Sequence, residues 1–347
     1  EALRIFEKAS LNMAWYNRLV ENREVIAEQL DAMAYIMEDC AKKQKNITEE
    51  CRSNLQDIAY RARERGIKVI DEQLGKRESG RWQLVMKVMV KDGCVTTREL
   101  TKAVAGALNR RMIPEKDTKT LIGKGVNLYT YEEEPRFQAI YGVARMVKDG
   151  AAVSGDNFSF LEPESGKMVM CLSDGMGSGS LACKESEMVI ELVEKFLEAG
   201  FDVETAARMM NSAMVMKGQE DLFSTVDISE LDLYDGTCRF YKIGAAATFI
   251  RRNGIVECLI STSLPVGVSY KLDMEKSEKD LYNGDFLVMV SDGVLEYLHV
   301  PNPEETMQEI IESIETNNAT ILAKRILERV LLFTGGKAAD DMTVAAT

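Results

Sequence analysis

The chain has 347 residues, enough for two or three domains, and its 46% hydrophobic and 29% charged residues are typical of a globular protein. Its net charge of −13 disfavours bulk binding to DNA or RNA, which needs a basic surface to displace counterions. A single histidine, His299, excludes multi-histidine metal sites and weakens any Ser-His-Asp or Cys-His mechanism. The seven cysteines include no C-x-x-C pair, which disfavours zinc and indicates a reduced, cytosolic chain.

No apolar stretch approaches the ~20 residues that a membrane helix needs. We therefore expect a cytoplasmic region. The first residue is Glu1 rather than Met, so the chain could be a piece of a longer protein, and membrane attachment through a part before Glu1 stays open.

Residues 1–65 contain no Gly or Pro and are predicted to form a helical hairpin. The first helix carries one apolar stripe, spaced four and three residues apart as in a coiled-coil seam: Ile26, Leu30, Met33, Met37 and Cys40. A second helix is expected to start near Asn46 or Thr48 and to end before Gly66. The segment is either a plain structural hairpin or a regulatory element that docks on the rest of the chain or forms a homodimer.

Residues 66–134 are predicted to form a small α/β unit without a catalytic constellation. Apolar and β-branched runs predict three strands, and a Thr-capped amphipathic stretch predicts one helix: strands 67–70, 82–90 and 126–131, and helix 97–112. The run 132–135 joins three glutamates to a proline and marks a solvated boundary.

Residues 135–347 combine densely spaced strands with two pairs of helices. Strands are predicted at 138–146, 157–161, 168–172, 224–233, 238–243, 247–251, 256–260, 286–290 and 342–346, and helices at 181–199, 203–216, 304–316 and 319–332. The Asp-Gly pair at 235–236 is a hairpin turn signal. Strands that alternate with helix pairs favour an α+β fold built as a layered sandwich.

Two apolar runs end in the same tripeptide, Ser-Asp-Gly, which is expected to place Asp174 and Asp292 at the ends of two buried strands. The glycine that follows each aspartate lets the backbone turn. Asp156 follows a glycine upstream, and Asp340 opens an Asp-Asp-Met-Thr run near the C-terminus. Carboxylates that converge at strand ends suit Mg²⁺ or Mn²⁺, because these hard cations prefer oxygen ligands.

If these four aspartates meet, their charges repel strongly unless cations are bound. Two cations about 3.5–4 Å apart could hold a bridging water, lower its pKa and clamp a phosphate. This chemistry needs no His, Cys or Ser nucleophile, so it suits a chain with one histidine. The candidate catalytic residues are Asp156, Asp174, Asp292 and Asp340.

Taken in order, these motifs resemble those of the metal-dependent type 2C serine/threonine protein phosphatases. The residues that carry the resemblance are Gly155-Asp156, Ser173-Asp174-Gly175-Met176-Gly177, Ser291-Asp292-Gly293 and Asp340-Asp341-Met342-Thr343. The runs 153–156 and 264–267 are similar to those of bacterial sporulation phosphatases in this family. The resemblance implies a layered α-β-β-α phosphatase domain over 135–347, with the helical segment 1–65 and the unit 66–134 as a cytoplasmic regulatory region.

The resemblance also implies roles for individual residues. Asp174 would bridge two Mn²⁺ or Mg²⁺ ions, and the backbone carbonyl of Gly175 would bind one of them. Asp292 and Asp340 would complete the other site. Asp156 would ligate directly or hold a metal-bound water.

A reaction and a partner follow from the same resemblance. A metal-activated water would attack phosphoserine on a small anti-anti-sigma factor protein, and its dephosphorylation would free a sporulation sigma factor. The chain also departs from the family: no arginine near Asp156 matches the phosphate-binding arginine of eukaryotic members, and 244–247 lacks a histidine common in bacterial relatives. Substrate phosphate would then rest mainly on the metals. Asp341 resembles the variable position after the ligand aspartate and is placed second to Asp340.

Two other interpretations stay open. The Gly-x-Gly-x-Gly run at 175–179 lies between a predicted strand and a predicted helix, where a dinucleotide-binding loop would sit. Ser180 holds the position of the third glycine of the usual motif, which counts against that interpretation. The phosphatase-like region could instead be a non-catalytic interaction scaffold.

Overall fold

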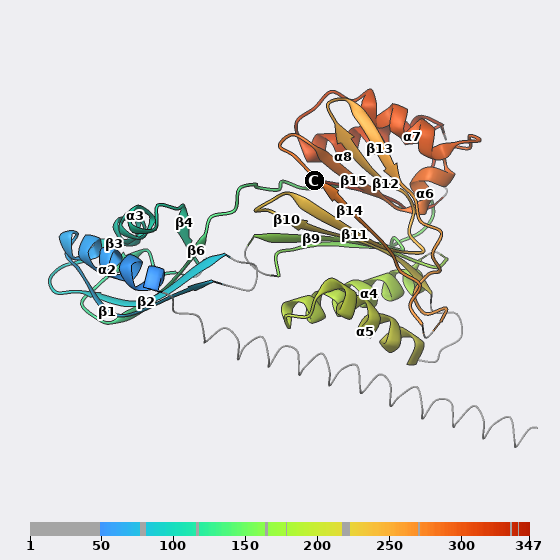
Figure 1. Ribbon diagram of the computed structural model, residues 1–347. Coiled ribbons are helices and arrows are strands. Elements are labelled where there is room, and N and C mark those ends of the chain that lie inside the picture. Colours follow the sequence, from blue (N-terminus) through green and yellow to red (C-terminus); the bar gives the residue numbers. More distant parts are fainter. Residues whose placement is uncertain are drawn as a thin grey trace, which may run out of the picture. The chain divides into compact units, whose positions relative to one another are not determined.

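A computed structural model describes residues 49–76, 81–115, 118–163, 166–177, 179–216, 223–269, 271–333, 335–338 and 340–347 (Figure 1). They fall into two compact units, one that ends at Arg136 and one that runs from Phe137 to Thr347. The predicted first N-terminal helix, with its apolar stripe, lies outside the described residues.

The smaller unit is a four-stranded antiparallel sheet in the order β1-β2-β6-β4, packed against two helices. Its elements are α2 (Glu49–Glu64), β1 (Ile67–Lys76), β2 (Trp82–Val90), β3 (Val95–Thr96), α3 (Thr97–Leu108), β4 (Met112–Pro114), β5 (Leu121–Ile122) and β6 (Asn127–Glu133). Ile58 of α2 and Leu100 of α3 are fully buried in one cluster with Leu84 of β2. The helix α2 therefore belongs to the core of this unit.

The helix α3 ends four residues before its predicted end at Met112. Asn109 adopts a left-handed conformation with a φ of 49°, and its N–H bonds to the carbonyl of Ala105. This is a common way for a helix to end, because it satisfies a free carbonyl of the last turn. Met112 then begins β4, at the edge of the sheet.

The larger unit contains two five-stranded antiparallel sheets, ordered β14-β11-β10-β9-β8 and β13-β12-β15-β16-β7. The first sheet and its helices are β8 (Asp156–Leu161), β9 (Lys167–Gly175), α4 (Ser180–Glu198), α5 (Val203–Met216), β10 (Ser224–Asp232), β11 (Thr237–Ile243) and β14 (Glu275–Asp280). The second set is β7 (Gly142–Met146), β12 (Thr248–Arg252), β13 (Ile255–Leu259), β15 (Phe286–Val290), α6 (Asp292–Glu296), α7 (Pro303–Glu312), α8 (Ala319–Phe333) and β16 (Met342–Ala346).

Three buried clusters hold this unit together. One joins α4 and α5 to the outer face of the first sheet, and another joins α7 and α8 to the outer face of the second sheet (Figure 1). The third lies between the two sheets and contains Met170, Leu172, Cys238, Phe240, Ile250, Leu281, Leu287 and Met289. The strands β9 and β15 read as continuous apolar runs because their two faces each meet one of these clusters.

The antiparallel pairing of β9 with β10 excludes the dinucleotide-binding interpretation. That motif needs a strand, a helix and a second strand parallel to the first. Here two helices separate β9 from β10, and Thr225 pairs with Asp174 in an antiparallel ladder. The α+β class is confirmed, with mixed helices and antiparallel sheets.

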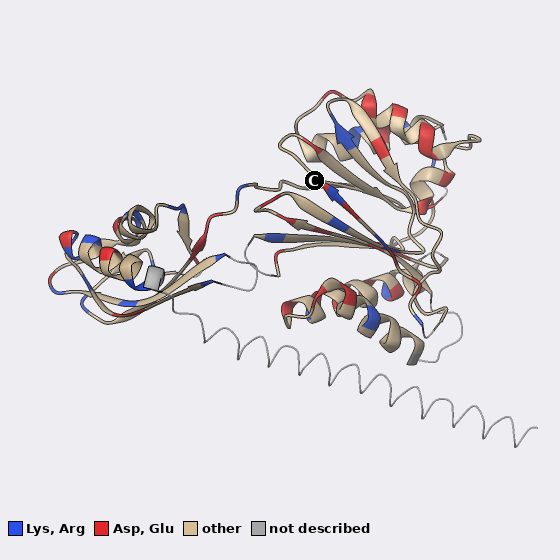
Figure 2. Cartoon of the chain, viewed as in Figure 1, with Lys and Arg blue, Asp and Glu red and all other residues tan. Residues whose placement is uncertain are grey.

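Among the described strands, the prediction missed the short β3, β4 and β5, of two or three residues each, and also β14, whose sequence is the charged run Glu-Lys-Ser-Glu-Lys-Asp. The strand β14 pairs only with β11 and forms a sheet edge, where charged side chains blunt unwanted pairing with other chains. Figure 2 shows acidic and basic residues interspersed on the outer helix α4, whereas α7 carries acidic residues and no basic ones. Among the described helices, none combines the length and the apolar run needed to span a bilayer.

Candidate metal centre

Asp156 and Asp174 face each other on neighbouring strands. Asp156 begins β8, Asp174 lies near the end of β9, and the two are register partners in the antiparallel pair. Two residues along each strand, Phe158 and Leu172 pack in the layer between the sheets. Because side chains alternate along a strand, both carboxylates point into that same layer.

Asp292 and Asp340 come from the other sheet. Asp292 is the first residue of α6, just after β15, and Asp340 precedes β16. The charge of Asp292 acts on both carboxyl groups of the first sheet. A Cβ built at Gly293 would lie 3.4 Å from the Cβ of Asp340 and 2.1 Å from the carbonyl oxygen of Asp341, so a side chain would not fit there. The glycine of the Ser-Asp-Gly motif therefore permits the close approach of the two acidic segments.

Asp156 is a buried carboxyl group without a hydrogen-bond partner. Its side chain is 1% exposed, and neither carboxylate oxygen makes a hydrogen bond to a described residue. The hydroxyls of Thr343 and Ser291 lie close enough to favour its charged form, but with poor hydrogen-bond geometry. Burial is the largest cause that raises the pKa of Asp156, and the charge of Asp292 adds to it.

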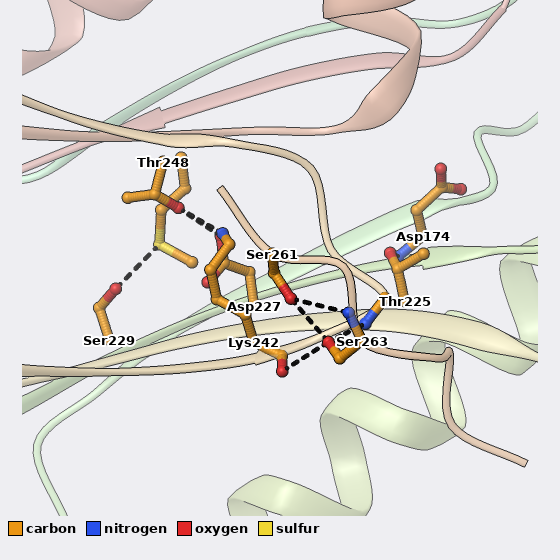
Figure 3. A network of polar contacts seen from close by, with 10 residues as sticks. Asp174, Thr225, Asp227, Ser229, Lys242, Thr248, Ser261 and Ser263 are labelled. Atoms are coloured by element: carbon orange, nitrogen blue, oxygen red, sulfur yellow. Dashed lines mark hydrogen bonds and ion pairs between the residues drawn. The ribbon is translucent and has the colours of Figure 1, made fainter. Parts of the chain in front are cut away.

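Asp174 shares this environment. Burial raises its pKa most, and the carboxyl groups of Asp292 and Asp156 raise it further. The strand β10 holds its backbone from both sides: the Asp174 N–H donates to Thr225 Oγ1 at 3.3 Å (Figure 3), and the Ser224 hydroxyl donates to the Asp174 carbonyl at 2.7 Å. The backbone position of this aspartate is thus fixed by the sheet.

Glycines let α4 approach the acidic residues. A Cβ at Gly175 would lie 2.1 Å from the carbonyl oxygen of Ala182, and a Cβ at Gly155 would lie 3.0 Å from the Cβ of Ala182. The Ser186 hydroxyl, one turn further along α4, donates to the Gly155 carbonyl. The carbonyl oxygen of Gly175 lies 3.6 Å from the same built Cβ at Gly155, so this predicted ligand sits beside the residue that precedes Asp156.

Asp341 fixes the backbone of the site. It is 5% exposed, and its Oδ1 accepts the Lys148 N–H at 2.9 Å while its Oδ2 accepts the Gly155 N–H at 2.8 Å. These bonds join the start of β16, in one sheet, to the residue before Asp156 in the other. Both oxygens of Asp341 are therefore engaged with backbone donors.

Two basic side chains lie beside the acidic residues. Arg145 of β7 donates to the backbone carbonyl of Asp156 at 2.6 Å, so an arginine lies beside Asp156 in the fold although none near it in the sequence matches the phosphate-binding arginine of eukaryotic members. The Lys148 Nζ lies 3.5 Å from Asp340 Oδ1, and both side chains are 36% exposed. Arg145 was missed because it reaches the site from the edge strand of the other sheet, a relation that the sequence does not display.

The chemistry of this site fits a hard divalent cation. A buried carboxylate without a partner is costly, and a cation removes that cost while oxygen ligands satisfy the cation. Asp156, Asp174 and Asp292 are electrostatic neighbours, and Asp340 adjoins Asp292 through Gly293. Within the described ranges, no three His, Cys, Asp or Glu side chains are already arranged to hold one metal ion together.

Two packed antiparallel sheets with acidic residues at one end of the layer between them are the fold of a PP2C-type phosphatase. The chain matches the solved structure of the PP2C phosphatase domain and a fragment of the regulatory domain of SpoIIE from Bacillus subtilis, with a TM-score of 0.65 and 28% identity, over 95% of this chain and 97% of that one. A sequence model described as Stage II sporulation protein E (SpoIIE) matches residues 164–347. The chain belongs to the stage II sporulation protein E family, which confirms the resemblance to the type 2C phosphatases, a group of hydrolases.

Curated relatives agree. Stage II sporulation protein E of Bacillus subtilis is 28% identical over 328 residues, which cover 94% of this chain and 40% of that relative. The chain spans 56% of the corresponding protein of Priestia megaterium. Phosphoserine phosphatase RsbX of Bacillus subtilis is 35% identical over 86 residues, 25% of this chain and 41% of that protein.

Proposed function

We propose that this chain is a Mn²⁺- or Mg²⁺-dependent protein serine phosphatase that uses two ions. Asp174 would bridge the ions, and the carbonyl of Gly175 would bind one of them. Asp292 and Asp340 would complete the other site, and Asp156 would ligate directly or through water. The ions would activate a water for attack on the phosphoserine and neutralise the phosphate.

The observation that carries this proposal is the cross-strand pair of buried carboxyl groups, Asp156 and Asp174. Both groups resist ionisation in the absence of a cation, and no hydrogen bond from a described residue offsets the burial of the Asp156 carboxylate. A purely structural core would gain from apolar residues at these positions. The remaining coordination would come from water, which Mg²⁺ usually keeps.

Other residues would orient the ligands. Arg145 fixes the backbone carbonyl at Asp156, and Asp341 fixes the N–H of the preceding glycine. Lys148 pairs with Asp340 at the exposed side of the site. These contacts set the directions of two carboxylates that come from different sheets.

The substrate we propose is phosphoserine on a small anti-anti-sigma factor protein, so that the reaction activates a sporulation sigma factor. The similarity to RsbX, a phosphoserine phosphatase, supports the chemistry. The similarity to the stage II sporulation protein E of two bacteria supports a role in sporulation. A net charge of −13 supports a protein partner rather than nucleic acid.

The same proposal covers the architecture: a layered α-β-β-α phosphatase domain at 135–347, a small α/β regulatory domain at 66–134 and a helical regulatory segment at 1–65. The segment would form a hairpin and a homodimer through its apolar stripe, and its last helix, α2, packs on the small domain. We place the chain in the cytoplasm of a bacterium.

The test is hydrolysis of a phosphoserine protein by the purified chain, with EDTA, Mg²⁺ or Mn²⁺. We expect turnover only with a divalent cation, and loss of that turnover in Asp174→Ala without loss of the fold. The matched control is Asp71→Ala. It removes an exposed carboxylate of the smaller unit, which forms an ion pair with Lys87. A wild-type chain that stays inactive with every cation would favour the non-catalytic scaffold, and a fully active Asp174→Ala variant would reject the site.

A further inference from the structure

The layer between the two sheets contains one buried group of charged and polar side chains behind the acidic residues. It is formed by Asp227 of β10, Lys242 of β11 and Thr248 of β12 (Figure 3). The three side chains are 2%, 3% and 0% exposed. On the same faces of these strands, Phe240 and Ile250 belong to the apolar cluster of this layer. We call the three residues the inter-sheet triad.

The triad is closed by short hydrogen bonds. Lys242 Nζ donates to Asp227 Oδ2 at 2.5 Å and to Thr248 Oγ1 at 2.8 Å, and the Thr248 hydroxyl donates to the same Asp227 oxygen at 2.5 Å. Asp227 and Lys242 are register partners within the first sheet, whereas Thr248 belongs to the second. The triad is therefore a polar link from one sheet to the other.

The triad lies directly behind the candidate metal centre. Asp227 pairs with Leu172, and Thr225, two residues earlier on β10, pairs with Asp174 and accepts its N–H. Two residues of a strand span roughly 7 Å. On the second sheet, Thr248 pairs with Met289, three residues before Asp292. The link thus joins β10 and β12, which pair with the strands β9 and β15 that lead to Asp174 and Asp292.

Stability alone gives no reason for such a group. The desolvation cost of a buried ion pair is barely offset by the attraction between its charges. Apolar residues of similar volume often give equal or greater stability. The second carboxylate oxygen of Asp227 has no hydrogen bond to a described residue, which adds to the cost. A directional link does what an apolar contact cannot: it fixes the spacing and the register of the two sheets, because hydrogen bonds tolerate little change in distance.

We propose that Asp227, Lys242 and Thr248 are positioning residues for the metal centre. They hold the first sheet, with Asp156 and Asp174, at the spacing from the second sheet at which Asp292 reaches the same cations. This inference rests on the proposed function, since it concerns the geometry in which the acidic residues would bind metal. The triad itself touches neither the substrate nor the cations.

The test replaces the whole triad, because removal of one charge would leave the other buried alone. In Asp227→Val/Lys242→Met/Thr248→Val we expect a melting temperature of the metal-free protein equal to or above that of the wild type. We expect its Mn²⁺ affinity, measured by titration calorimetry, to fall about 10-fold, as when other groups that orient metal ligands are lost. Amide hydrogen exchange at Asp174 and Asp292 in the metal-free protein should become faster, and this readout is independent of activity.

A milder variant keeps the test decisive if the triple variant does not fold. Thr248→Val removes the link to the second sheet and leaves the Lys242–Asp227 pair, so we expect a smaller loss of Mn²⁺ affinity with a preserved fold. The matched control is Ser229→Ala on the same strand β10, which removes a buried hydroxyl that contacts the Met289 sulfur and lies four residues beyond Thr225, the partner of Asp174. This control should bind Mn²⁺ as the wild type does.

The outcomes separate this inference from the proposed function. A wild type that binds no Mn²⁺ overturns both. A wild type that binds Mn²⁺ while the folded triple variant or Thr248→Val binds it equally well, with unchanged amide exchange, overturns the role of the triad alone.

Discussion

At one end of the layer between the two sheets, Phe240, Leu287 and Met289 pack as an ordinary apolar core, whereas at the other end Asp156 and Asp174 are buried as carboxyl groups. The strand β9 runs through both ends, since it carries Met170 and Leu172 of the apolar cluster as well as Asp174. The apolar end supplies free energy of folding through burial, roughly 25 cal/mol per Å². The acidic end opposes folding through desolvation and repulsion. The comparison teaches that the fold tolerates the destabilising carboxyl groups because apolar packing, which begins two residues along the strand at Leu172, stabilises the same unit.

The largest expected effect is a loss of Mn²⁺ affinity when a carboxylate of the acidic end is removed. Asp156→Asn removes a candidate ligand, so its Mn²⁺ affinity should fall by more than the about 10- to 100-fold that loss of an outer-shell partner costs. The same change removes a buried charge, so the melting temperature of the metal-free protein at about pH 8 should stay equal or rise. Titration calorimetry and thermal melts with and without EDTA measure both quantities. A variant that binds Mn²⁺ normally would contradict our assignment of Asp156.

The converse change removes a side chain from the apolar end and is expected to lower stability rather than metal affinity. Phe240→Ala deletes a ring that is 1% exposed between the sheets and should lower the free energy of unfolding by about 3–5 kcal/mol. Under conditions in which Phe240→Ala is folded, it should keep the Mn²⁺ affinity of the wild type, because the carboxyl groups are unchanged. Urea unfolding measures the stability, and titration calorimetry at urea concentrations below the unfolding transition measures the affinity. Equal losses of stability and of metal affinity would show that the two ends are not separable.

A smaller effect is expected from Asp341, which holds backbone groups of the site. Asp341→Asn leaves one oxygen acceptor and turns an amide NH₂ toward a backbone donor, so we expect about a 10-fold loss of Mn²⁺ affinity. Asp341→Ala should lose more. The control is Asp273→Asn, an exposed carboxylate that accepts the Leu264 N–H at 3.0 Å elsewhere in the unit. Equal affinities of Asp341→Asn and Asp273→Asn would refute the orienting role.

The smallest effect is a pH dependence of the metal-free protein. The raised pKa values of Asp156 and Asp174 mean that the folded state keeps protons that the unfolded state has released above about pH 4. Their contribution to stability is therefore full at low pH and is lost as the pH rises. In EDTA, the melting temperature should fall more steeply between about pH 5.5 and 8.5 for the wild type than for Asp156→Asn. Parallel slopes would mean that burial does not perturb this carboxyl group.

Much of this fold was predictable from local pattern. The helix Val203–Met216 and the strands Phe286–Val290 and Met342–Ala346 have the predicted bounds, because strong apolar periodicity or continuous burial defines them. Short or charged elements were not predictable: β14 has no apolar residue, and β7 begins at Gly142 rather than at 138. Such strands exist only because a neighbouring strand pairs with them.

The candidate site likewise has a part that local motifs predict and a part that they do not. The Ser-Asp-Gly motifs single out Asp174 and Asp292, because a strand end and a glycine are local signals. The cross-strand pairing of Asp156 with Asp174, the approach of Arg145 and the inter-sheet triad depend on contacts between distant segments. No spacing within the chain encodes these contacts, so they needed the structure.

The central claim is that acidic residues from two sheets bind divalent cations together. Crystals soaked in Mn²⁺ and measured at the manganese absorption edge test it most directly. We predict anomalous density within coordination distance of the Asp174 carboxylate and the Gly175 carbonyl, with Asp292 on the opposite side. Saturating Mn²⁺ that leaves this place without anomalous density would contradict the account.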